Sequence, residues 1–181
     1  MNSSSDKFRA HSRPASRGEG APSQAGARIA KVMARAGLCS RREAERWIAD
    51  GRVAVNGEVL DSPACVVTDK DKVIVDGKQL GNAGAAKLWL YHKPPGLVTT
   101  HADPEGRPTV FQHLPASLGR VISIGRLDLN SEGLLLLTNA GTLAHLIEHP
   151  SLGWTRAYRV RAYGHLSQSA IDRLAKGVVF E

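Results

Sequence analysis

The feature that most limits how this chain can fold is a set of start and stop signals in its first third. Apolar residues recur at helical spacing from Ile29 to Ala36, and Gly37 follows where a helix would end. Ser40 and Glu43 then have the spacing of a capping box, in which each side chain binds a backbone amide of the other residue. Two short helices in succession are therefore predicted.

The residues after the second helix predict a small antiparallel sheet. Asn56-Gly57 separates two runs of β-forming residues, which is the strongest short-range signal for a hairpin. Apolar runs at 66–67 and 72–75 add two short strands. Residues 28–80 should therefore form one compact module of two helices and a small sheet.

The rest of the chain divides into a tail, a linker and a second module. Residues 1–26 are rich in Ser, Gly, Ala, Pro and Arg, and they carry too little apolar surface to offset the entropy of ordering. We expect a disordered basic tail that either adds affinity for phosphate or only keeps the chain in solution. A mitochondrial presequence is a further alternative, which Asp6 and Glu19 disfavour. Residues 81–86 are small and form the linker.

Residues 87–181 alternate strands, loops and short helices, which predicts an α+β domain around a mixed, mostly antiparallel sheet. Helical spacing occurs at 142–149 and at 169–176. The patterns predict strands at 88–91, 121–124, 133–138 and 157–162.

The composition bounds the partners of the chain. In 181 residues, 24 Lys and Arg outnumber 17 Asp and Glu, and the resulting net charge of +7 points to a polyanionic partner. Cys39 and Cys65 lie far apart without zinc-finger spacing, which argues against a disulfide scaffold or structural zinc and fits a reducing cytoplasm. No apolar run approaches the length of a membrane span.

Basic side chains gather on the two predicted helices, away from the apolar stripes. Most charge runs of this kind are simply solvated helix faces, and a surface for a polyanion is the alternative. We call this set the basic face: Arg28, Lys31, Arg35, Arg41 and Arg42.

Charged and polar residues also gather between two apolar runs, at residues 125–139. A loop between buried strands is where a rigid scaffold commonly presents catalytic groups. Asp128 could act as a nucleophile or general base, and Arg126 could pair with a phosphate or with Asp128 itself. A structural Arg126–Asp128 pair that holds a turn is the alternative. His145 and His149 have a spacing that can bind zinc, but no third ligand is evident and we expect surface or packing histidines.

The segment 28–59, RIAKVMARAGLCSRREAERWIADGRVAVNGEV, resembles the S4-type RNA-binding domain. In that family, the helix pair and the following hairpin dock on structured RNA. The resemblance implies that the basic face is the surface that contacts RNA.

The string 125–139, the KPPG turn at 93–96 and RAYRV at 156–160 together resemble the RsuA/RluB/RluE/RluF family of pseudouridine synthases, most closely the RluB type that acts on large-subunit rRNA. These enzymes isomerise a uridine in ribosomal or transfer RNA. The resemblance implies a synthase domain at 87–181, which follows the S4-type module along the chain. It also implies that no cofactor is needed, because the reaction involves no redox change and no group donor.

The resemblance assigns roles to three residues. Asp128 matches the essential carboxylate, which acts either as a nucleophile or as the base that removes a sugar proton. Tyr158 matches the tyrosine that packs on the flipped uracil, although a tyrosine packed in the sheet core is the alternative. Arg126 matches the arginine that contacts the RNA backbone or fills the gap left by the flipped base. The implied partner is ribosomal RNA or a ribosomal-subunit precursor, with the protein a monomer in the cytoplasm.

Two departures from the family pattern bear on function. Ala140 stands where the family usually has an aspartate, which should alter a turn rather than the chemistry. The family also continues beyond the position of Glu181, with a basic motif that closes the active site. Either the sequence is a fragment with a C-terminally incomplete domain, or the protein lacks part of the pocket. A non-catalytic RNA-binding protein with a degraded or truncated synthase domain is therefore the second hypothesis.

Overall fold

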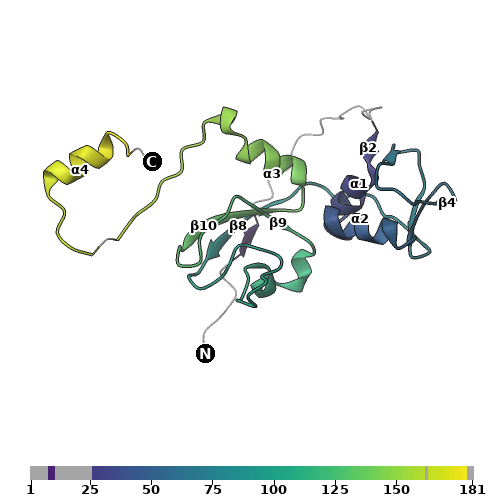
Figure 1. Ribbon diagram of the computed structural model, residues 1–181, viewed down its shortest axis with the longest axis horizontal. Coiled ribbons are helices and arrows are strands. Elements are labelled where there is room, and N and C mark those ends of the chain that lie inside the picture. The colour runs from purple at the N-terminus through teal and green to yellow at the C-terminus, as the bar shows by residue number, and fades with distance from the viewer. Residues whose placement is uncertain (1–7, 11–25, 162, 179–181) are drawn as a thin grey trace.

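The fold is known from a computed structural model that describes residues 8–10, 26–161 and 163–178. The chain forms a helix pair with small strands, then a four-stranded sheet with a helix against it, and last a separate short helix (Figure 1). The α+β class and the mostly antiparallel sheets that the sequence predicts are confirmed. Among the described residues, no helix has both the length and the apolar content that crossing a bilayer requires.

The helix pair begins and ends where the sequence signals place it. Helix α1 (Ile29–Arg35) is followed by Gly37, whose φ of 81° places it in the left-handed region that favours glycine. Helix α2 (Arg41–Ala49) starts with the expected capping box: Glu43 N donates to Ser40 Oγ at 3.1 Å, and Ser40 N donates to Glu43 Oε2 at 3.4 Å.

Two tight turns shape the small sheet that follows. Asn56 and Gly57 both have positive φ, 54° and 95°, and form the expected hairpin turn. Asp76 and Gly77 repeat that geometry and form a second hairpin that the sequence analysis missed. The sheet has the order β4-β3-β6-β7, and a separate two-stranded ladder joins β2 and β5. The strands are β2 (Ala27–Arg28), β3 (Val53–Val55), β4 (Glu58–Val59), β5 (Val66–Val67), β6 (Val73–Val75) and β7 (Lys78–Gln79).

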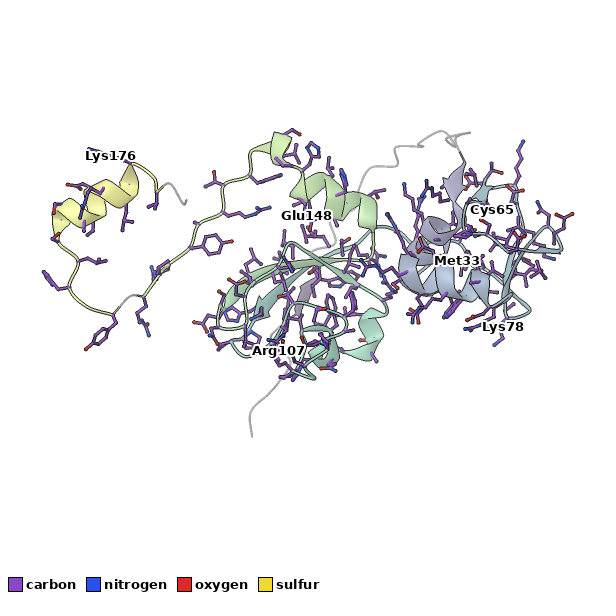
Figure 2. The ribbon with its side chains drawn as sticks, in the orientation of Figure 1. Met33, Cys65, Lys78, Arg107, Glu148 and Lys176 are labelled. Atoms are coloured by element: carbon purple, nitrogen blue, oxygen red, sulfur yellow. The ribbon has the colours of Figure 1, made fainter. Side chains whose placement is uncertain are left out.

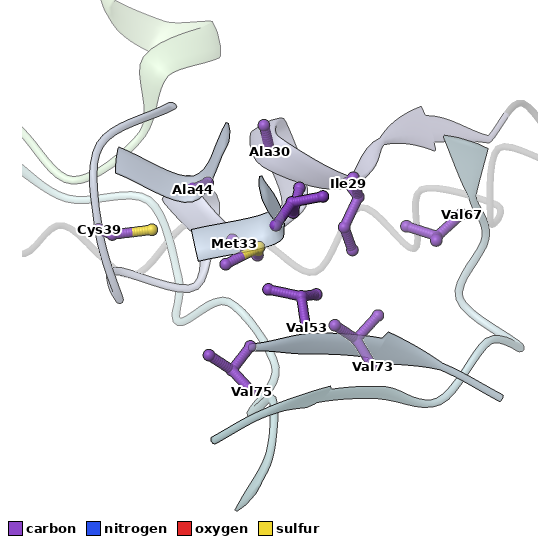
Figure 3. Packing of buried hydrophobic residues seen from close by; sticks show 10 residues of the cluster. Ile29, Ala30, Met33, Cys39, Ala44, Val53, Val67, Val73 and Val75 are labelled. Atoms are coloured by element: carbon purple, nitrogen blue, oxygen red, sulfur yellow. The ribbon is translucent and has the colours of Figure 1, made fainter. Parts of the chain in front are cut away.

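The helix pair packs its apolar stripes against this sheet and forms the first hydrophobic core. Met33 from α1, Ile48 from α2 and Val53 from β3 are fully buried, and Figure 3 shows Met33 directly over the strands. Burying such side chains stabilises the module by roughly 1.5–3 kcal/mol each.

The second sheet has the order β1-β8-β10-β9, with every neighbouring pair antiparallel. Its two interior strands are six residues long, and its two edge strands have three residues each. A second core, separate from the first, lies on one face and includes Trp89, Tyr91, Leu135 and Leu137. The strands are β1 (Phe8–Ala10), β8 (Leu88–Lys93), β9 (Ile122–Ile124) and β10 (Gly133–Thr138).

One helix of this module packs against the sheet, and another lies away from it. Helix α3 (Gly141–Glu148) packs beside β9 and β10, whereas α4 (Gln168–Ala175) lies away from the sheet at the end of an extended segment (Figure 1). Three single-turn 3₁₀ helices complete the fold: η1 (Phe111–His113), η2 (Ala116–Leu118) and η3 (Pro150–Leu152).

Two expectations need correction. Residues 8–10 form an edge strand on β8, although they belong to the segment expected to be disordered; β8 offers them an unpaired backbone edge. The remainder of the tail up to residue 25 lies outside the described residues. The strand expected at 157–162 does not form: residues 157–161 have no regular structure, because no sheet edge pairs with them, and residue 162 lies outside the described part. The proposed domain limits, 28–80 and 87–181, stay predictions.

Candidate active site

The loop that carries Asp128 joins β9 to β10. Gly125 opens the loop and Gly133 starts β10, and both have positive φ, 73° and 126°, that a side chain would strain. The two glycines shape the backbone where the loop leaves β9 and where it enters β10. The polar segment between the strands therefore stands at the end of the sheet as the sequence predicts.

A buried lysine holds this loop from beneath. Lys93 is the last residue of β8, and its alternation with Trp89 and Tyr91 points it into the core, where it is completely buried. Its ammonium has only three protons and is surrounded by four carbonyl oxygens. Lys93 Nζ lies 2.7 Å from the oxygen of Ser131, 2.9 Å from Asp128, 3.1 Å from Pro94 and 3.3 Å from Leu129.

The electrostatics of Lys93 follow from this location. Burial lowers the pKa of the Lys93 ammonium, and the nearby Asp128 carboxylate partly opposes that shift. A charged ammonium hydrogen-bonds carbonyl oxygens more strongly than a neutral donor does. The Lys93 contacts therefore fix the backbone of the loop and leave the side chain of Asp128 unconstrained.

Three further contacts tie the loop to its surroundings. Thr99 Oγ1 donates to Leu127 O at 2.7 Å, and Gly96 N donates to Leu129 O at 2.7 Å. At the other end, Gly125 N donates to Glu148 Oε1 at 2.5 Å. Figure 2 shows Glu148 on α3, beside the sheet. The KPPG turn, the segment after it and α3 thus hold the loop from several sides.

Asp128 and Arg126 both expose their side chains on this loop. In the described part of the chain, neither side chain takes part in an ion pair, and no hydrogen bond joins them. The structural Arg126–Asp128 pair is therefore not formed. An exposed carboxylate on a loop held by its backbone is suited to act as a nucleophile or general base.

Tyr158 is not brought to this loop. Tyr158 lies on the extended segment after η3 and is 68% exposed. It is therefore not packed in the core of the sheet, which was the alternative. No hydrogen bond or ring contact of Tyr158 occurs among the described residues. The structure thus keeps Tyr158 apart from Asp128.

The basic face is exposed, as expected from its position off the apolar stripes of α1 and α2. All five of its residues are exposed, and within the described residues none forms an ion pair. Arg52 differs, because it makes a bidentate pair with Asp76 at 2.6 and 2.9 Å and lies 4.4 Å from the Trp47 ring centroid. Arg52 therefore joins α2 to the β6–β7 hairpin, and the five residues of the basic face stay available.

His145 and His149 lie on successive turns near the end of α3, with ring centroids 5.6 Å apart. His149 Nδ1 lies 2.7 Å from Ser151 Oγ. Across the described residues, no group of three or more His, Cys, Asp or Glu side chains is arranged to hold a metal ion. The geometry supplies no third ligand for the two histidines.

Sequence reasoning missed the role of Lys93 and Thr99. A lysine at the end of a strand usually reaches solvent, and only the alternation Trp89–Tyr91–Lys93 in an otherwise apolar strand indicated an inward side chain.

Family models match both modules. The model of the S4 domain matches residues 27–74, and that of RNA pseudouridylate synthase matches residues 87–178. An uncharacterized RNA pseudouridine synthase of Rickettsia typhi is 54% identical over 138 residues, which are 76% of this chain and 57% of that protein. The ribosomal large subunit pseudouridine synthase B of Pseudomonas aeruginosa is 46% identical over 86% of this chain and 42% of its own length.

The chain spans little more than half the length of the Rickettsia relative. A solved structure, described as a pseudouridylate synthase, is 30% identical, with a TM-score of 0.38, and the match covers 68% of this chain and 53% of that one.

The Lys93 contacts predict a specific loss of stability. In Lys93→Met the apolar side chain still fits, but the carbonyl oxygens of Ser131 and Pro94 lose the donor that Lys93 supplies, and each unsatisfied buried group costs about 1–3 kcal/mol. We expect the free energy of unfolding, measured by urea denaturation, to fall by at least about 2 kcal/mol. The control is Lys87→Met, just before the same strand, whose exposed side chain makes no such contacts. Equal stability of the two variants would contradict the role of Lys93.

Proposed function

The chain belongs to the RNA pseudouridylate synthase family, and we propose that it converts a specific uridine of ribosomal RNA to pseudouridine, with Asp128 as the catalytic carboxylate. The large-subunit rRNA is the proposed substrate, because the Pseudomonas relative is named for that subunit. The observation that carries the proposal is the Asp128 loop, since its backbone is fixed by buried Lys93 while its carboxylate faces solvent without a partner among the described side chains.

The reaction explains why one well-placed carboxylate is enough. The N1–C1′ bond breaks, the uracil turns, and C5 bonds to C1′; C5 then loses its proton and N1 gains one. Electrons and atoms balance within the nucleotide, so the protein supplies only positioning and a group that attacks carbon or accepts a proton. Asp128 is proposed for that step, as nucleophile or as base.

The remaining residues are proposed to bind the RNA. The basic face would contact phosphates of structured RNA, since five exposed cations without carboxylate partners favour a polyanion. Arg126, two residues before Asp128, would contact the backbone at the target or occupy the space that the flipped base leaves. Work on ribosomal RNA would place the protein in the cytoplasm.

Tyr158 is proposed to stack on the flipped uracil once RNA is bound. Its exposed side chain on an extended segment gives it no competing structural role in the described chain. Stacking on an aromatic ring is worth roughly 1–3 kcal/mol per base, which offsets much of the cost of unstacking.

Asp128→Asn tests the catalytic assignment. The substitution removes the charge and keeps the shape, so we expect turnover to fall by at least roughly a thousandfold. Stability should change by less than about 0.5 kcal/mol, because the side chain is exposed. Turnover is measured as tritium release from C5-labelled uridine in a large-subunit rRNA transcript, with the full-length gene product.

Glu132→Gln in the same loop is the matched control, and it should keep its turnover. Tritium release by Asp128→Asn at the wild-type rate would refute the assignment. A wild-type protein that binds the transcript but releases no tritium would favour the second hypothesis, a non-catalytic RNA-binding protein.

The basic face is tested by reversing three of its charges. Lys31→Glu, Arg41→Glu and Arg42→Glu together should weaken RNA binding and lower the slope of log Kd against log salt by about 0.7–0.9 per lost phosphate contact. The control carries the same charge change outside the helix pair, at Lys70, Lys72 and Lys78, which are also exposed. Equal effects of the two triple variants would mean that only net charge matters.

Tyr158→Ala and Tyr158→Phe separate stacking from other roles of the ring. Tyr158→Phe keeps the aromatic face and should retain most turnover, whereas Tyr158→Ala should lose about tenfold or more in single-turnover rate. Thermal unfolding of both variants should match the wild type, because the residue is exposed. An active Tyr158→Ala would show that the residue does not stack on the base.

A further inference from the structure

A small cavity lies on the synthase module outside the Asp128 loop. Its volume is about 220 Å³, and it is formed by the segment that follows β8 and by the turn before β9. Pockets for drug-sized ligands span roughly 300–1,000 Å³, so this one suits a single planar ring or a phosphate. Its lining includes His101, Phe111, Leu114, Pro115, Arg120 and Val121.

One wall of the cavity is a stacked pair of rings. The His101 and Phe111 centroids are 3.6 Å apart and their planes differ by 13°. Burial lowers the pKa of His101, and the Arg120 charge lowers it further. His101 presents a flat aromatic ring, and its residue is exposed.

The lining of the cavity also includes a cation. Arg120 is half-buried, and in the part of the chain that the structure describes no carboxylate pairs with it. Its charge acts on His101 and also lowers the pKa of Cys39 in the helix-pair module, against the larger raising effect of burial.

The cavity is also linked to the Asp128 loop. Thr99, two residues before His101, both donates to Leu127 O and accepts from Leu127 N at 3.3 Å. A flat ring beside an unpaired cation offers the two contacts that one nucleotide needs, stacking for its base and charge for its phosphate.

We propose that this cavity binds one nucleotide of the RNA next to the target uridine, with the base on His101 and the phosphate on Arg120. The proposal rests on the proposed function, because it takes the RNA that the synthase acts on as its ligand. Base stacking needs no particular sequence, so this nucleotide anchors the strand and leaves sequence recognition to other contacts.

The test uses the full-length protein and the large-subunit rRNA transcript, with Kd measured by filter binding over a range of salt. Arg120→Gln should weaken binding several-fold and lower the salt slope by about one. His101→Ala should weaken binding by about 5- to 100-fold while the salt slope stays at its wild-type value, because stacking releases no counterion. His101→Phe should restore binding.

Lys70→Gln is the matched control, an exposed cation far from the cavity along the chain, and it should not change the slope as Arg120→Gln does. Both cavity residues are accessible, so far-ultraviolet circular dichroism should confirm that the variants fold. If Arg120→Gln and His101→Ala bind the RNA with the wild-type affinity, the proposal is overturned. A protein partner would then be the alternative ligand of the cavity. Because binding is the readout, a wild type that binds RNA without turnover would refute the proposed function and still test the cavity.

Discussion

The buried ammonium of Lys93 is the interaction on which the rest of the candidate site depends. A charge in a hydrophobic core is costly unless it is fully hydrogen-bonded, and Lys93 meets this condition with backbone carbonyls only. Lys93 belongs to β8, an interior strand of the sheet, and the loop leads directly into β10. These two hydrogen-bonded strands therefore limit the movement of the loop. Thr99 and Glu148 then hold the first part of the loop, at Leu127 and Gly125.

The two modules divide the proposed work by charge and by geometry. The S4 module presents exposed cations on short helices, whereas the guanidinium of Arg52 pairs with Asp76 and helps to hold the module together. The synthase module presents the Asp128 carboxylate on a loop whose backbone is hydrogen-bonded to Lys93. In the proposed function, binding would therefore rest on many weak contacts that salt can screen, whereas the chemistry would rest on a few contacts whose distances are fixed.

Local signals made much of the fold predictable, and contacts between distant segments made the rest unpredictable. The capping box at Ser40 and the Asn56-Gly57 turn act within four residues, and both are confirmed. Asp76-Gly77 is a turn of the same kind that went unnoticed because the residues after it are polar. The position of the Asp128 loop between two strands was also predictable. Its anchor was not, because Lys93 lies 35 residues away from Asp128.

The strand expected around Tyr158 shows a limit of sequence patterns. Alternating residues indicate which side chains would share a face, but a strand also needs a neighbouring backbone to pair with. One edge of the sheet is taken by β1, and the other belongs to β9. Residues 157–161 pair with neither, and Tyr158 consequently remains on an extended segment.

The lengths of the sheet strands bear on how the chain avoids aggregation. An exposed strand edge is a template on which other chains can add, and a long apolar edge is the most hazardous kind. Here β8 and β10, six residues each and rich in leucine, lie inside the sheet, and only three-residue strands form its borders. The amino-terminal strand β1 covers the middle of β8, from Trp89 to Tyr91. The amino-terminal segment thereby shields part of the backbone edge of an apolar strand.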